Sequence, residues 1–407
     1  MTGVRHPAAS SSEASELSEF SDPSDPYALS KFPDPSDPSA SSELSDPSDP
    51  SVKDRVALPR AVHPIDAGIE DHPRKEHMML LSRVAESVYW SSRYLERAEA
   101  TARLMKIHTE MFLDLPRHVG IGWSPLLAVT GSREDFDAHH GEATEDDVIR
   151  FLATDPSSSA SIVSAIAAAR TNFRVTRAIF PNSSWEELNR LFLWIAESRS
   201  VAVDRRTRAS WMDRVIRDCQ VLRGLLSSTM SHDAAYSFME IGRALECADM
   251  TTRVLDVQAG VLLSQPVASE STVATYGDIT WASVLKSLSA HQMFCRTVRS
   301  GIGGPEALRF LLRDPQFPKS VEHSLTRISR ELLELPRYDA AMARCAEVQR
   351  LLVDAEVGEL AGDGLHDYVD QLQIGIADLH SALTQTYFMR APESVQRQSS
   401  DALVATA

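Results

Sequence analysis

Hydrophobic residues recur at steps of three and four along most of the chain, which is the period of an amphipathic helix. The stripe in the first such segment consists of Leu81, Val84, Val88, Ser91, Leu95, Ala98, Ala102 and Met105. This pattern predicts a long helix from about Leu80 to Asp114, which ends before Pro116. No segment shows the apolar-polar alternation of a half-buried strand, so the sequence predicts an all-α helical bundle.

The same period predicts further helices at residues 162–179, 185–203, 211–230, 234–263, 281–299, 321–335, 340–357 and 365–389. Two predicted helix starts carry the spacing of a capping box, in which a hydroxyl residue is followed three positions later by an acidic one. These are Thr144 with Asp147 and Ser183 with Glu186.

The chain ends differ from this helical pattern. In residues 1–77, Asp-Pro pairs recur every 12 residues among Ser and Pro, at Asp22, Asp34 and Asp46. Such a segment has too little apolar surface to offset the entropy lost on ordering, so we expect a disordered tail. We therefore expect a helical domain over residues 78–392 and a short flexible tail over residues 393–407.

Composition removes several classes of function. The chain has 41 Lys and Arg against 57 Asp and Glu, a formal net charge of −16, whereas nucleic-acid binding relies on clustered basic residues. The four cysteines form no C-x-x-C pair, which argues against a zinc site or a disulfide framework and favours a cytoplasmic location. No segment reaches the ~20 apolar residues of a membrane helix. Phosphate-binding glycine loops and Glu-x-x-His pairs are absent, so no cofactor and no metal are expected.

The most informative feature is an internal repeat. Residues 93–103 align without gaps to residues 243–253, and Arg, Leu, Glu, Ala, an acidic residue, Thr and Arg recur in register. The apolar stripe recurs with them. The repeat predicts two homologous helices that pack about a pseudo-two-fold axis.

Charged residues occupy a face beside that stripe on both helices. The candidate binding residues are Arg93, Glu96, Arg97, Arg103, Arg243, Glu246 and Arg253. If the two faces meet, the charges lie at half-buried depth and need partners, because an unpaired buried ion costs several kcal/mol. One interpretation is a set of salt bridges within each helix, Arg93–Glu96 and Arg243–Glu246. The other is a cleft whose arginines hold a carboxylate or a phosphate.

Four segments carry a resemblance to a known family: residues 82–99, 169–177, 241–251 and 310–321. Together they resemble the bacterial alpha-E family, a helical family named for its Glu-Arg signature. The second signature departs from the pattern, because Cys247 stands where the family has Arg. Lys319 likewise replaces an Arg that is usual in the last segment.

The resemblance implies partners rather than a reaction. Alpha-E proteins accompany ATP-grasp-type ligases and transglutaminase-like proteins, which implies that this chain is an accessory or co-catalytic partner in amide or peptide ligation. It would bind an anionic intermediate or the ligase through the Arg/Glu face. One alternative is an amide or peptide hydrolase with Glu96 or Glu246 as general base, and another is a purely structural helical interaction protein. The sequence leaves open whether the chain is an enzyme.

Overall fold

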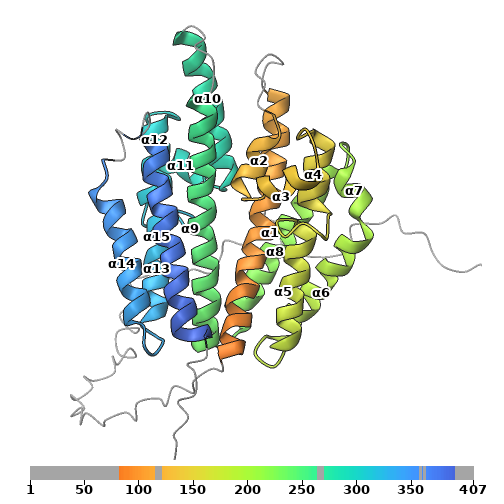
Figure 1. Ribbon diagram of the computed structural model, residues 1–407, viewed down its shortest axis with the longest axis vertical. Coiled ribbons are helices and arrows are strands. Elements are labelled where there is room, and N and C mark those ends of the chain that lie inside the picture. Colours follow the sequence, from red (N-terminus) through yellow and green to blue (C-terminus); the bar gives the residue numbers. More distant parts are fainter. Residues whose placement is uncertain (1–81, 115–121, 264–269, 357–359, 361–363, 390–407) are drawn as a thin grey trace, which may run out of the picture. The chain divides into compact units, whose positions relative to one another are not determined.

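Two long helices, α1 (Ser82–Asp114) and α9 (Ala234–Leu263), lie side by side in the middle of the helical bundle (Figure 1). The computed structural model describes residues 82–114, 122–263, 270–356, 360 and 364–389, all within the unit His72–Ala407. All regular structure in these residues is helical. The all-α prediction and the pairing of the two repeated helices are therefore confirmed.

Further helices lie between α1 and α9 along the chain. They are α2 (Ser124–Val129), α3 (Arg133–His139), α4 (Glu145–Ala153), α5 (Ile162–Val175), α6 (Asn182–Glu197), α7 (Arg199–Val203) and α8 (Arg208–Thr229). The helices after α9 complete the bundle. They are α10 (Glu270–Ser287), α11 (His291–Thr297), α12 (Gly304–Arg313), α13 (Val321–Leu332), α14 (Asp339–Asp354), α15 (Leu365–Leu383) and the π-helical turn η2 (Thr384–Phe388).

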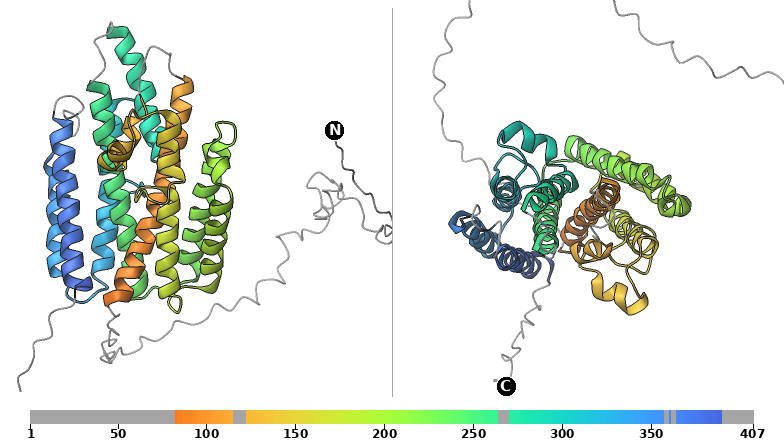
Figure 2. Two further views of the ribbon diagram at one scale, coloured as in Figure 1. Left: turned by 45° about the vertical axis from the view of Figure 1, so that its right-hand side comes forward. Right: turned by 90° about the horizontal axis from the view of Figure 1, so that it is seen from above.

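The two halves repeat the same packing. α1 packs on α5 and α8, and α6 packs on both of these helices. In the same way α9 packs on α13 and α15, and α14 packs on both of these (Figure 2). Buried positions of α8 recur one for one in α15: Met212, Val215, Cys219, Leu222 and Leu226 correspond to Val369, Leu372, Ile376, Leu379 and Leu383. The pseudo-two-fold relation thus extends from the signature helices to their neighbours.

The connections before α5 and α13 are also duplicated. The Ser161 hydroxyl donates to the carbonyl of Asp155 (2.6 Å) and caps α5 by accepting from the backbone N–H of Ser164. Ser320 makes the same two bonds, to the carbonyl of Asp314 (2.5 Å) and from the N–H of His323. A serine cap of this kind satisfies a backbone donor that the helix leaves free.

Close contact between α1 and α9 depends on small residues. Ala98, Ala102 and Ala248 are fully buried. Gly242 lies so close to α1 that an added Cβ would collide with the backbone carbonyl of Tyr89. The repeated stripe therefore lies in the core, where Leu95 and Leu245 are 8% and 1% exposed.

Several predicted boundaries are wrong for local reasons. The predicted helix at 185–203 breaks after Glu197, at the point where the Ser198 hydroxyl donates to the carbonyl of Trp194 and accepts from the Trp211 indole. The predicted helix at 281–299 is part of α10 followed by α11, and Ser289 between them has a positive φ of 58°. The predicted helix at 365–389 ends in the π-helical turn.

The two capping boxes had different outcomes. Thr144 accepts from the backbone N–H of Asp147, as predicted. Ser183 does not begin α6, because the helix starts at Asn182 directly after Pro181, whose fixed φ suits that position.

The expected tails at residues 1–77 and 393–407 lie outside the described residues and stay predictions. Among the described helices, none is both long and apolar enough to cross a membrane.

Candidate functional site: two buried charge clusters at the α1–α9 interface

Five of the seven predicted charged residues lie at the interface between α1 and α9, in two separate groups. The first charge cluster is Arg93, Arg97 and Glu246. The second charge cluster is Glu96, Glu99, Arg103, Arg223 and Lys319. The pseudo-two-fold relation places the two signature glutamates in different clusters, so the charged faces of the two helices do not form one group.

Glu246 organises the first charge cluster from α9. Its carboxylate accepts from Arg93 Nε at 2.7 Å and from Arg97 Nε at 2.6 Å, both on α1. Burial alone would raise the pKa of Glu246, but the two guanidiniums outweigh it and hold that pKa below its usual range. The pairs therefore cross between the helices, and the predicted intrahelical Arg93–Glu96 and Arg243–Glu246 bridges do not form.

Aromatic side chains close the first charge cluster. Arg93 Nη1 donates to the Tyr89 hydroxyl at 3.3 Å, and that hydroxyl is hydrogen-bonded to His380 Nδ1 at 2.8 Å. The Arg93 guanidinium also lies 4.9 Å from the centre of the Trp90 ring. Burial raises the pKa of Tyr89 to about 12 and lowers that of His380 to about 4, so both groups are neutral at pH 7.

The second charge cluster is built on two carboxylates of α1. Glu96 pairs with Arg223 at 2.5 Å and with Lys319 at 3.0 Å. Glu99 pairs with Arg223 at 2.6 Å and with Arg103 at 2.7 Å. Both carboxylates are buried, 2% and 0% exposed, whereas the sequence predicted half-buried depth for Glu96. Burial would raise their pKa values, yet the adjacent cations keep both values low.

Lys319 reaches this cluster because its backbone is fixed on α9. The Thr251 hydroxyl donates to the carbonyl of Lys319 at 2.9 Å, and Ser320 caps α13 directly afterwards. From this position the ammonium group extends to α1. Burial would lower the pKa of Lys319, but Glu96 and Glu99 raise it overall, so the amine stays charged.

The other two predicted arginines of α9 pair along their own helix. Arg243 donates to Glu240 at 2.8 Å, and Glu240 is also paired with Arg327 at 3.1 Å. Arg253 pairs with Asp249 at 3.0 Å. Neither arginine contacts Glu246. Each predicted site residue therefore lies in an ion pair, but the partners differ from those predicted.

A small cavity lies beside the second charge cluster, with about 30 Å³ available to the centres of water molecules. It is lined by Ser92, Leu95, Glu96, Cys219, Arg223, Leu226, Met239, Glu240 and Arg243. A volume of this size holds at least one water molecule or a small group of a ligand. The cavity combines an apolar wall with two carboxylates and two guanidiniums.

Cys247 occupies the position in α9 that Arg97 has in α1. It is 3% exposed, and burial raises its pKa to about 12, so the thiolate is disfavoured. A thiol cannot supply the charge that Arg97 gives to Glu246. On the matching side of the interface, Arg223 and Lys319 supply positive charge to Glu96 instead.

Sequence reasoning missed Glu99, Arg223, Glu240 and Arg327 as site residues. Glu99 carried a detectable signal, since an acidic residue recurs at this position in the repeat. Arg223 and Arg327 come from α8 and α13, outside the repeated segment, and only helix packing places them here. The sequence singled out Lys319 as a departure from the family pattern but assigned no role to it.

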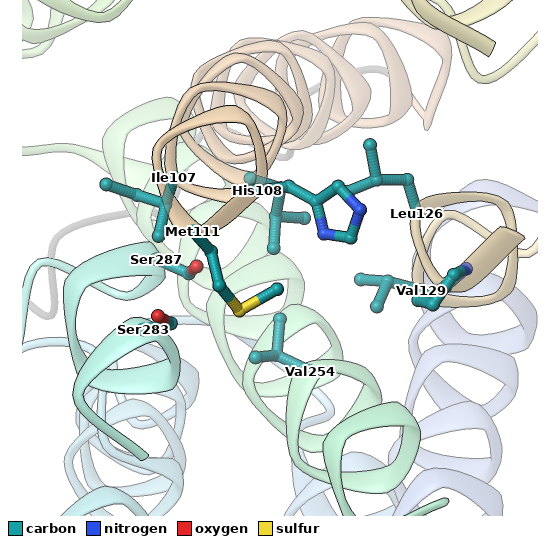
Figure 3. A pocket seen from close by; sticks show the side chains of 10 residues that line it. Ile107, His108, Met111, Leu126, Val129, Val254, Ser283 and Ser287 are labelled. Carbon is teal, nitrogen blue, oxygen red and sulfur yellow. The ribbon is translucent and has the colours of Figure 1, made fainter. Parts of the chain in front are cut away.

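A second small cavity lies at the far end of α1 (Figure 3). Its wall includes His108 and Met111 of α1, Leu126 of α2 and Val254 of α9. Burial lowers the pKa of His108 to about 4, and its Nε2 lies 3.0 Å from the carbonyl of Gly122. Within the described residues, no group of three or more His, Cys, Asp or Glu side chains is placed to hold a metal.

Comparison with known proteins gives relatives of unknown function. The chain is 22% identical over 332 residues to the uncharacterized protein Rv2567 of Mycobacterium tuberculosis strain H37Rv and to the uncharacterized protein Mb2597 of Mycobacterium bovis. These matches cover 75% of this chain and 36% of each relative, so the chain spans about a third of the relatives' length. No solved structure matches.

Residues 80–388 match a family described as a predicted alpha-helical domain with a conserved ER motif. In this chain that motif corresponds to Glu96-Arg97, whose two residues lie in different charge clusters of the α1–α9 interface. The matched region contains both signature helices and the bundle around them. The chain belongs to the Alpha-E family.

Proposed function

We propose that this chain is a helical accessory partner of an ATP-grasp-type amide or peptide ligase system, and that it contributes binding rather than proton transfer. The observation that carries the proposal is the state of the two signature glutamates. Glu246 is paired with two arginines, and Glu96 is paired with an arginine and a lysine.

A general base needs a pKa near the working pH and a free lone pair directed at the substrate. At Glu96 and Glu246 the surrounding cations lower the pKa despite complete burial, and the carboxylate oxygens are occupied by hydrogen bonds. These properties favour the accessory role over an amide hydrolase that uses either glutamate.

The proposal that the partner is a ligase rests on the family resemblance. The relatives support it indirectly: the chain matches only 36% of their length, so in those proteins the Alpha-E region is joined to other protein sequence. A helical module joined to a second region is the arrangement expected of an accessory domain. The first charge cluster, closed by Tyr89 and Trp90, then serves the architecture, and the second lies at a cavity.

The test combines the purified chain with an ATP-grasp-type ligase from the same organism and follows ADP release with amino acids and short peptides. We expect the chain to raise the ligase rate and to hydrolyse no amide by itself. Amide hydrolysis by the chain alone that is lost in a folded Glu96→Gln or Glu246→Gln variant would support the hydrolase instead. Ligase binding without any change in rate would leave the purely structural role as the better description.

A further inference from the structure

The pseudo-two-fold relation brings two equivalent places to opposite sides of the α1–α9 pair. The cavity residues Ser92, Leu95 and Glu96 of α1 correspond to Gly242, Leu245 and Glu246 of α9. The cavity residues that come from α9 are Met239, Glu240 and Arg243. They correspond to Tyr89, Trp90 and Arg93 of α1. The cavity residues that come from α8 are Cys219, Arg223 and Leu226. They correspond to Ile376, His380 and Leu383 of α15. The cavity therefore has a counterpart, which is the surroundings of the first charge cluster.

In that counterpart the arginine is bonded to two different residues, and no hydrogen bond of Arg93 Nη2 is found among the described residues. Arg93 donates through Nε to Glu246 and through Nη1 to the Tyr89 hydroxyl. The Tyr89 ring also lies within 5.7 Å of His380 and 5.1 Å of Phe388, measured between ring centres. Tyr89 thus supplies both the apolar filling and the oxygen that this arginine needs.

On the cavity side, Met239 replaces the tyrosine and offers no oxygen. Arg243 donates to Glu240 through Nε and Nη2, and no hydrogen bond of its Nη1 is found among the described residues. Arg243 lines the cavity together with Leu95, Leu226 and Met239. A guanidinium donor and apolar side chains therefore line the cavity together. In the counterpart, the phenol ring of Tyr89 occupies the equivalent position.

Charge and access favour an anion in this place. The neighbouring second charge cluster holds three cations, Arg103, Arg223 and Lys319, against two carboxylates, Glu96 and Glu99. Glu240 is paired with both Arg243 and Arg327, and Arg327 is also paired with Glu331. The side chains of Arg223 and Arg243 keep 34% and 19% of their surface exposed, so the cavity is reachable from solvent.

We propose that the cavity between α1, α8 and α9 binds a short-chain carboxylate, with the carboxylate on Arg243 and Arg223 and the alkyl part against Leu95, Leu226 and Met239. A carboxylate matches the planar donors of a guanidinium, and about 30 Å³ suits a small group. The inference deepens the proposed function by naming the ligand class of the same site, since an amide ligase joins a carboxylate to an amine.

The test uses the chain alone, so it does not depend on the ligase. Thermal denaturation is followed with sodium propionate, with propionamide as the neutral analogue of the same shape, and with sodium chloride at equal ionic strength. We expect a saturable rise in the midpoint with propionate only. Met239→Tyr copies the closed counterpart and should abolish this rise, whereas Met239→Leu, which adds no oxygen, should retain it.

If Met239→Tyr does not fold, Arg243→Lys replaces it, because lysine keeps the charge but lacks the planar pair of donors. We expect propionate to bind this variant about tenfold more weakly. Equal responses to propionate and propionamide, or a Met239→Tyr or Arg243→Lys protein that responds like the parent, would overturn the proposal. So would a parent protein that does not respond to propionate. In each case the ligase experiment remains informative about the accessory role.

Discussion

Arg93 Nε of α1 lies 2.7 Å from Glu246 Oε2 of α9, so one helix of the repeat supplies the arginine and the other supplies the carboxylate. The reciprocal pair does not form. Glu96 is instead paired with Arg223 and Lys319, and Arg243 is turned to Glu240 on its own helix. The pseudo-symmetric core is thus electrostatically asymmetric, and its cavity lies on the side where the interhelical arginine pair is missing.

Replacing Glu246 by Gln should destabilise the protein strongly. The change leaves the buried guanidinium of Arg93 and the adjacent Arg97 without a countercharge, and breaking a buried pair costs about 3–5 kcal/mol. The measurement is urea denaturation at pH 7. The matched control is Asp137→Asn in the exposed Arg133–Asp137 pair, for which we expect a loss below about 1 kcal/mol. Similar small losses for both variants would show that the first charge cluster does not hold the helices together.

Truncation of the apolar stripe tests the same interface without charge. Leu245 is 1% exposed, so Leu245→Ala should cost about 2–5 kcal/mol through lost burial and the cavity left behind. Leu95→Ala should also be destabilising, because Leu95 is 8% exposed. Leu193→Ala on α6, where the side chain is 49% exposed, should change stability by about 0.5 kcal/mol or less. A small effect at Leu245 would contradict the observed packing of α1 on α9.

The close approach of the two helices can be tested at one glycine. In an open helical position Gly→Ala stabilises by about 0.5–1 kcal/mol, because alanine is the better helix former. At Gly242 the new methyl group would collide with the Tyr89 carbonyl, so Gly242→Ala should destabilise by about 1–3 kcal/mol. Gly224→Ala on α8, where no atom lies within 4 Å, should be stabilising. If both variants changed the free energy of unfolding in the same direction in denaturant titrations, the result would argue against the tight contact.

As the pH falls, protonation of His108 should destabilise the protein before the paired carboxylates become protonated. The pKa of this buried histidine falls from 6.5 in the unfolded chain to about 4 in the fold, so the folded state binds fewer protons between these values. Its contribution to stability is complete above pH 6.5 and is lost as the pH falls toward 4. His108 by itself should account for a loss of about 2 kcal/mol between pH 7 and pH 5, and His380, whose pKa is also lowered to about 4, should add to this loss. The paired glutamates have lowered pKa values and lose their contribution only below about pH 4.5.

The check is the free energy of unfolding at both pH values for the parent and for His108→Gln, which can still donate to the Gly122 carbonyl. The loss between pH 7 and pH 5 should be about 2 kcal/mol smaller in the variant. His232→Gln serves as the control, because the His232 side chain is exposed. A parent and a His108→Gln protein with the same pH dependence would contradict this assignment.

The sequence by itself determined the elements and the faces. A period of 3.6 residues fixes which side chains of a helix lie together, so the all-α class, the long first helix and the repeat of residues 93–103 at 243–253 were predictable. The same periodicity placed Arg93, Glu96 and Arg243 beside the apolar stripe. It could not resolve local breaks such as the one at Ser198, whose hydroxyl donates to the Trp194 carbonyl and accepts from the Trp211 indole of α8.

Only the tertiary structure decided which charges meet. Periodicity places a residue on a face, but it does not say which distant segment packs against that face. Arg223 arrives from α8, and Lys319 arrives from a connection fixed by Thr251, so Glu96 acquired partners that no spacing in the repeat encodes. The identity of residue 89 or 239 was readable from the sequence. Only the packing of α15 and α8 against the central pair shows what each residue does. Tyr89 fills the space beside Arg93, whereas Met239 leaves a cavity beside Arg243.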